Sequence, residues 1–176
     1  MATTFTFFKR KTLSRAVLVF PGELEDKPEI DSHIRPLYTI DSHTRHYTLL
    51  EHSADETHDV LSGKIEGLLG RSAVITGDCF LSTAKRSSII KDGWKFVHMS
   101  DTFTWHVNWR STQWTLRDLN KRELARFERK SFKVTKSGTL YLLQPMDKDL
   151  LTLTILTCEI VHRDIKTRER AASGGS

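Results

Sequence analysis

The sequence is poor in the residues that cross-link or interrupt a fold. Only 2 cysteines and 4 prolines occur among its 176 residues. Cys79 and Cys158 are far apart and form no CxxC pair, so neither a disulfide framework nor a cysteine-based metal site is indicated, and a reducing compartment is expected. Long apolar runs are also lacking. In the apolar stretch Leu150 to Val161 the first nine residues carry no charge, whereas a membrane-spanning helix needs about 20 apolar residues. We therefore expect no transmembrane segment.

Common catalytic signatures are missing as well. No GxSxG, Walker or HExxH pattern occurs, so nucleophilic, P-loop and zincin chemistries lack support. His162 to Lys166 spells HRDIK, the core of a protein-kinase catalytic loop, but Glu169 occupies the position of the required Asn and no DFG follows. His52, His58 and Asp59 match no zinc spacing, and we expect them in a solvated loop. We expect no cofactor, no metal and no enzymatic activity.

Length and composition predict one soluble domain. Hydrophobic residues make up 38% and charged residues 28% of the chain, which is typical of a globular protein. We expect a single domain over residues 1–170 and a flexible tail over residues 171–176. The apolar run Ala16 to Phe20 is too short for a signal peptide. The expected location is intracellular and cytoplasmic, with peripheral contact to membranes.

Short runs of β-prone residues, separated by turn-forming residues, dominate the chain. Trp105, Val107 and Trp109 alternate with polar residues, the period of a strand with one buried face. The expected loops and turns include Pro21 to Pro36, the acidic stretch Glu51 to Asp59, and Lys136 to Gly138. Phe80 to Ile90 has only a weak pattern. The other expected strands are Thr3–Phe8, Arg15–Phe20, Leu37–Ile40, Arg45–Leu50, Gly63–Leu69, Ser72–Ile75, Trp114–Leu116, Leu124–Phe127, Phe132–Val134 and Thr139–Leu143.

The apolar stretch near the C-terminus predicts a buried helix. Asp147 is placed as an N-cap, and His162 and Arg163 lie where cations favour a helix C-terminus. Between these ends the large aliphatic residues point in all directions, so one sheet could not cover them. A helix from Lys148 to Arg163 would be about 24 Å long, the height of a small barrel. The expected fold is mostly β, a closed antiparallel β-barrel around a buried C-terminal hydrophobic helix.

This order of elements resembles the tubby C-terminal-like superfamily, which includes tubby, phospholipid scramblase and LURP-one-related proteins, and is most similar to an uncharacterised fungal branch. Four stretches carry the resemblance: Pro36 to Ser53, Gly93 to Asp118, Glu123 to Pro145, and the helix with the basic residues after it. The resemblance implies a twelve-stranded barrel around the helix. It also implies binding of phosphoinositide headgroups by basic residues on the barrel surface. The calcium-binding segment and cysteine cluster of scramblases do not occur here, so scramblase activity is not implied.

Basic residues are concentrated in one stretch. Lys121 to Lys136 holds seven basic and two acidic residues, and therefore the whole formal charge of +5. Such clustering can mark contact with phosphate or an anionic membrane. The predicted lipid-binding or anion-binding residues, called here the basic band, are Arg126, Arg129, Lys130, Lys133 and Lys136. No recognition helix and no RNA-binding motif accompany them, so nucleic acid is not an expected partner.

Three functions remain open from the sequence. The first is a non-enzymatic binding module that contacts phosphoinositide or another anionic phospholipid through the basic band. The second is a protein-protein interaction domain without a lipid ligand, in which loops such as Pro21 to Pro36 contact the partner. The third is an enzyme with an unrecognised site, and a deep pocket lined by perturbed titratable groups would favour it.

Overall fold

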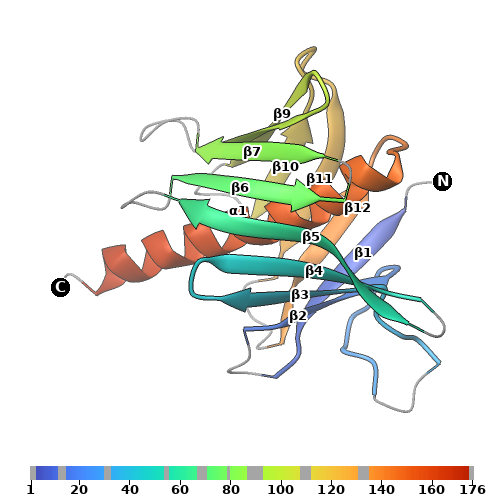
Figure 1. Cartoon of the computed structure of the whole chain (residues 1–176). Coiled ribbons are helices and arrows are strands. Elements are labelled where there is room, and N and C mark those ends of the chain that lie inside the picture. The colour runs from blue at the N-terminus through green and yellow to red at the C-terminus, as the bar shows by residue number, and fades with distance from the viewer. Residues whose placement is uncertain are drawn as a thin grey trace.

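Twelve antiparallel strands close into a barrel in this computed structural model (Figure 1). The structure describes residues 3–11, 15–29, 33–53, 56–66, 71–78, 80–86, 93–107, 112–130 and 135–174. The strands are β1 (Thr4–Lys9), β2 (Val17–Pro21), β3 (Tyr38–His43), β4 (His46–His52), β5 (Thr57–Glu66), β6 (Ser72–Gly77), β7 (Leu81–Arg86), β8 (Gly93–His98), β9 (Asp101–Val107), β10 (Gln113–Arg117), β11 (Glu123–Arg129) and β12 (Lys136–Leu142). Each strand pairs with its neighbours in sequence, and β1 closes the barrel by pairing with β12, Thr4 opposite Tyr141.

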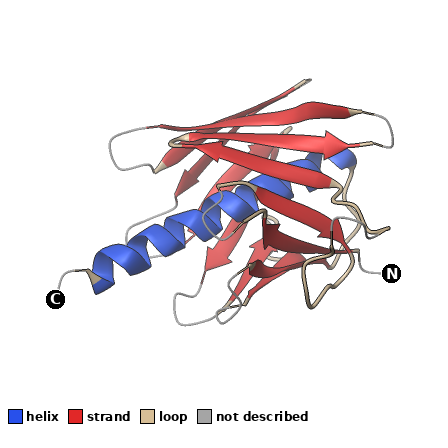
Figure 2. Cartoon of the chain, turned by 90° about the horizontal axis from the view of Figure 1, so that it is seen from below, coloured by secondary structure: helices blue, strands red, loops and turns tan. Residues whose placement is uncertain are grey.

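The helix α1 (Lys148–Ser173) passes through this barrel. Every residue from Thr152 to His162 is buried, which requires strands on all sides of this part of the helix. Figures 1 and 2 show that the C-terminal part of α1 continues beyond the strands. The predicted fold class, a closed antiparallel barrel around a buried C-terminal helix, is thereby confirmed.

Aromatic side chains from the strands pack against the enclosed helix. Trp94, Trp105 and Trp114 are all buried in the core, as their alternation with polar residues predicts for β9 and its neighbours. The indole Nε1 of Trp105 donates to Thr157 Oγ1 at 3.0 Å, and Thr157 in turn donates to the Leu153 carbonyl at 2.7 Å. Threonines can therefore occupy the interior helix without unpaired hydroxyls. The predicted strand partner Trp109 lies outside the described residues.

The start of α1 follows the prediction, but its end does not. Asp147 caps the helix, with its Oδ1 accepting from the Leu150 N–H at 2.7 Å. The helix continues ten residues past Arg163 to Ser173, because Ile165 still packs on the core while the charged residues around it reach solvent. His162 and Arg163 are thus interior to the helix. Residues 171–173, expected in a flexible tail, form its last turn.

Two other expectations are corrected by the sheet. His52, His58 and Asp59 lie in paired strands and not in a loop, since β4 and β5 continue into the acidic stretch. Lys136 to Gly138 forms the start of β12 instead of a turn, because Lys136 pairs with Phe8 and Gly138 with Phe7 and Arg129. The weakly patterned Phe80 to Ile90 contains β7. The expected strand Phe132–Val134 lies outside the described residues.

Residues 22–29, called here the strap, fold back over the outside of β1 and β12. Thr6 Oγ1 donates to the Gly22 carbonyl at 2.7 Å and accepts from the Leu24 N–H at 3.0 Å. The hydroxyl of Tyr141 donates to Glu23 at 2.8 Å. These contacts show that the described part of the expected loop, the strap, crosses the surface, and they explain why β12 is buried on both faces.

Candidate functional site

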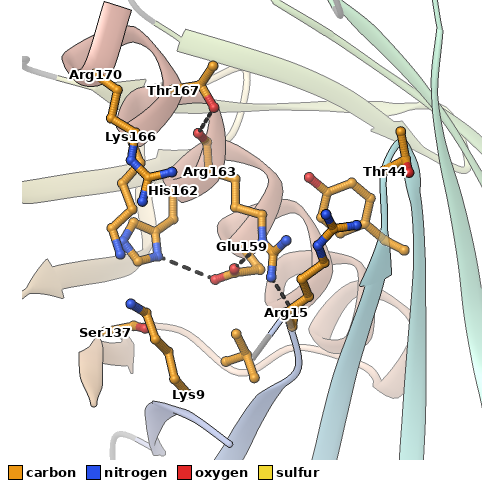
Figure 3. A pocket seen from close by; sticks show the side chains of 12 residues that line it. Lys9, Arg15, Thr44, Ser137, Glu159, His162, Arg163, Lys166, Thr167 and Arg170 are labelled. Atoms are coloured by element: carbon orange, nitrogen blue, oxygen red, sulfur yellow. Dashed lines mark hydrogen bonds and ion pairs between the residues drawn. The ribbon is translucent and has the colours of Figure 1, made fainter. Parts of the chain in front are cut away.

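A pocket of about 400 Å³ opens where α1 leaves the barrel. Four of its charged side chains come from one face of the helix: Glu159, Arg163, Lys166 and Arg170. Their spacing of four, three and four residues places them above one another on an α-helix. Lys9 at the end of β1 and Arg15 before β2 complete the charged lining (Figure 3). Five cations and one carboxylate therefore meet in one cavity.

Glu159 forms the buried floor of the pocket. Its carboxylate accepts from Arg163 Nε at 2.7 Å and lies 3.3 Å from His162 Nδ1 (Figure 3). Burial alone would raise the pKa of Glu159, but the hydrogen bonds and charges of these two partners lower its pKa below the ordinary value. The carboxylate is therefore ionised, and its charge is already matched by Arg163.

His162 is neutral in this arrangement. Burial lowers its pKa, with Lys166 and Arg129 adding to the effect and Glu159 opposing it. A neutral imidazole that donates from Nδ1 to Glu159 has an accepting Nε2. That Nε2 is buried and has no hydrogen-bond partner among the described residues. The ring instead packs against both Trp114 and Phe127, with centroids at 5.6 and 5.9 Å.

Arg163 is held from three sides. Besides Glu159, it donates through Nη2 to the carbonyl of Arg15 and lies 5.6 Å above the centre of the Tyr47 ring. Burial raises the pKa of Tyr47 to about 12, so its ring stays neutral and presents its π face to the guanidinium. Arg163 is therefore a fixed cation at the pocket wall.

The other four cations lack an ion-pair partner in the part of the chain that the structure describes. Among the described residues, no carboxylate forms an ion pair with Lys9, Arg15, Lys166 or Arg170. The pKa of Lys166 is lowered to about 8, first by burial and then by Lys9, with further contributions from Arg129 and Arg170 against the opposing charge of Glu159. Burial and nearby positive charge both favour the neutral amine of a lysine, and here burial is the larger cause. The pocket has the electrostatics of an anion site.

The basic band predicted from the sequence is not one surface. Arg129 binds Glu169 of α1 through both guanidinium nitrogens, at 2.6 and 2.8 Å. Arg126 lies 3.9 Å from Glu123, and Lys130 is exposed. Lys133 lies outside the described residues.

The prediction that Lys136 lies on the binding surface is wrong. Only 1% of the residue is exposed, because the strap covers it. Its Nζ donates to the carbonyl of Leu24 and lies 3.9 Å from Glu25 Oε1. Lys136 therefore holds the strap on the barrel and cannot contact a ligand on the exposed surface.

The pocket residues were missed because the basic band was sought by local density of charge. Lys9 and Arg15 flank separate strands, and Arg163 and Lys166 were assigned to the basic C-terminus of the helix. A signal was present: Glu159 near the end of the apolar stretch and Arg163, Lys166 and Arg170 after it repeat at helical spacing. Among the described members of the band, Arg129 alone links it to the pocket, through its effect on the pKa of His162 and Lys166.

The histidines of the acidic stretch have structural partners. His52 Nε2 lies 2.7 Å from Thr39 Oγ1, and His58 Nε2 lies 3.1 Å from Glu51 Oε2. Within the described ranges, no group of three or more His, Cys, Asp and Glu side chains could hold a metal ion. No helix in the part of the chain that the structure describes has the length and apolar character to cross a membrane.

Asp164 of the HRDIK sequence secures the helix to the barrel wall. Its Oδ2 accepts from the indole Nε1 of Trp94 at 3.1 Å, and it pairs with Arg168 at 3.2 Å and with Arg86 at 3.8 Å. These partners come from β8, α1 and β7. The kinase-like sequence therefore has a structural role in this fold.

The fold and the pocket rest on the structure alone, because comparisons with known proteins found no match. No family model matches the chain, no curated protein matches it, and no solved structure matches it. The resemblance to the tubby-like superfamily stays a prediction.

Proposed function

We propose that this domain is a non-enzymatic binding module for phosphate-bearing anions, and that its ligand is a phosphoinositide headgroup at a membrane surface. The observation that carries the proposal is the pocket at the end of the barrel, where five cations face a single buried carboxylate. A protein gains nothing in stability from holding like charges together, and this repulsion adds to burial in lowering the pKa of Lys166. A multivalent anion would relieve it.

The dimensions and chemistry of the pocket support a phosphorylated ligand. Its volume of about 400 Å³ lies within the range of about 300 to 1,000 Å³ that is usual for small-molecule sites. Arg15 and Arg170 offer planar guanidinium groups, which match phosphate oxygens in pairs. Cations at both the strand side and the helix side favour a ligand with more than one phosphate. The predicted resemblance to tubby-like proteins points to the same ligand class.

The alternative of a protein-interaction domain without a lipid ligand has less support. It assigned partner binding to the loop from Pro21 to Pro36, but the strap within this loop is tied to the barrel through Thr6, Tyr141 and Lys136. A partner would have to displace these contacts or bind elsewhere. The third function, an enzyme, has one feature in its favour, since the pocket is lined by groups with shifted pKa values.

Co-sedimentation with liposomes tests the proposal. Wild-type protein should bind liposomes that contain a phosphoinositide, and binding should weaken as salt rises from low to physiological concentration. The Arg15→Glu/Arg170→Glu variant removes two exposed pocket cations. Each cation near an anionic surface contributes about 1 kcal/mol, so loss of two should weaken binding by about 2 kcal/mol, roughly 30-fold.

Two variants with the same change of net charge separate the pocket from general electrostatics. Arg126→Glu/Lys130→Glu tests the exposed part of the basic band, and Lys64→Glu/Lys95→Glu alters two exposed lysines of β5 and β8. Both should bind much more tightly than the pocket variant. Equal losses of liposome binding in all three variants would show that the interaction depends only on net charge. A loss confined to Arg126→Glu/Lys130→Glu would move the site to the band, and no binding of the wild type to any liposome would refute a lipid ligand.

A further inference from the structure

Among the lysines that the structure describes, Lys166 has distinctive surroundings. It is half-buried in the pocket wall and faces Lys9 from β1, Arg129 from β11, and Arg170 and Glu159 from its own helix. Glu159 is occupied by Arg163 and His162, and Glu169 is occupied by Arg129. No carboxylate therefore pairs with the amine of Lys166 in the described part of the chain.

This environment favours the uncharged amine. With a pKa of about 8, about a quarter of the Lys166 side chains are unprotonated at pH 7.5, compared with about one in a thousand for an ordinary lysine. A lysine next to other cations becomes a nucleophile for this reason. The same cations would hold the phosphate of an incoming reagent beside it.

We propose that Lys166 is a modification site, acylated directly by small acyl phosphates whose phosphate group is bound by the pocket cations. This inference deepens the proposed function, since it rests on the pocket as a phosphate site. The ε-nitrogen attacks the carbonyl carbon, the bond from that carbon to the phosphate oxygen breaks, and inorganic phosphate leaves. The amine loses one proton to solvent, and the product is a neutral amide. No oxidant or reductant takes part.

Acylation would regulate the pocket. The cations that raise the reactivity of the amine also bind the leaving phosphate and stabilise the charge that it carries away. The amide has no charge, so the modified pocket holds one cation fewer. Binding of a phosphoinositide headgroup should weaken about fivefold, the loss of one cation near an anionic surface.

The test uses the intact chain and acetyl phosphate, with peptide mass spectrometry to follow acetylation at each lysine over time. The exposed lysines of the barrel wall, Lys64, Lys85 and Lys95, are internal controls. The larger unprotonated fraction, partly offset by the lower nucleophilicity of a weaker base, should make acetylation of Lys166 about tenfold faster than that of the controls. Excess inorganic phosphate should slow Lys166 and leave the controls unchanged. A rate at Lys166 no higher than at the controls would overturn the proposal.

A neutral acetyl donor, p-nitrophenyl acetate, separates reactivity from phosphate binding. If Lys166 is preferred with the neutral ester but not with acetyl phosphate, the pocket does not hold the phosphate and the proposal fails. The Arg170→Ala variant should slow the reaction with acetyl phosphate more than the reaction with the ester. Equal effects on both donors would also contradict it.

The outcome is distinguishable from that of the liposome experiment. Selective acetylation of Lys166 without liposome binding would support the modification site and refute the phosphoinositide ligand. Liposome binding without selective acetylation would do the reverse.

Discussion

Gly138 allows a direct test of the barrel, because the structure leaves no room for a side chain there. A Cβ at this position would lie 2.4 Å from the carbonyl oxygen of Glu128 and 2.4 Å from Cζ of Phe127. The first atom belongs to the backbone of β11. The second belongs to a ring that is stacked on Trp114 at 4.9 Å and packs edge-on against Phe7 at 5.5 Å. Neither neighbour can yield without opening the pairing of β11 and β12 by about 1 Å.

The Gly138→Ala substitution should therefore destabilise the protein. Overpacking of a core by one methyl group costs about 1 to 3 kcal/mol, and the backbone contact places this case at the upper end. The gain in β-propensity and in unfolded-state entropy offsets only about 0.5 to 1 kcal/mol. We expect a net loss of about 2 kcal/mol in the free energy of unfolding, measured by urea denaturation with tryptophan fluorescence and circular dichroism.

Gly63→Ala is the matched control. Gly63 also lies in a barrel strand and is buried, but its Cβ would meet Leu156 Cδ2 at 3.5 Å, Tyr47 Cβ at 3.7 Å and Ile75 Cγ1 at 3.8 Å, all ordinary contacts. Its free energy of unfolding should change by less than about 1 kcal/mol, with a small gain favoured. Equal stability of the two variants would refute the close approach of β11 to β12. It would restore the expectation that Lys136 to Gly138 is a turn.

Three further predictions concern the helix and the charges. Asp147→Ala removes the acceptor for the Leu150 N–H and should cost about 1 kcal/mol in urea denaturation, whereas Asp149→Ala, one residue inside the helix, should cost less. The pKa values of Glu51, Glu159 and Glu169 are lowered by their cationic partners. The contribution of these pairs to stability is full above about pH 4.5 and is lost as the pH falls through the lowered pKa values. The urea midpoint should therefore drop on acidification, and a constant midpoint from pH 7 to pH 3 would contradict these pairs. Binding of an inositol phosphate, measured by calorimetry, should weaken as the pH rises through about 8, the pKa of Lys166, because its ammonium group loses its proton and charge. The Lys166→Arg variant should keep its affinity at high pH. An identical decline in that variant would assign the effect to another group.

The secondary structure was predictable to the extent that it is local. Alternation around Trp105 and the short β-prone runs indicated strands, and Asp147 indicated the helix start. The end of the helix was misplaced because His162 and Arg163 are typical C-terminal residues, yet Ile165 still packs on the core. Lys136 and Gly138 were misplaced for a similar reason. Their polar and flexible character suggested a turn, while pairing with Phe8 and Phe7 of the distant β1 places them in a strand.

The candidate site depended on contacts that charge density does not reveal. The sequence predicted an anion-binding role from clustered basic residues, but Lys136 is covered by the strap and Arg129 is paired with Glu169. The pocket cations lie far apart in the sequence, from Lys9 in β1 to Arg170 in α1. They meet because β1 and the last turns of α1 lie at the same end of the barrel.

By itself, the sequence determined the class of the fold. An apolar helix that is hydrophobic on every face must be surrounded, and a chain of short alternating strands can surround it only by closing on itself. Tertiary structure decided which lysines are buried, which arginines are paired and which cations face one cavity. These properties follow from the register between β1 and β12 and from the depth at which α1 sits in the barrel. Both are set by packing among residues far apart in the chain.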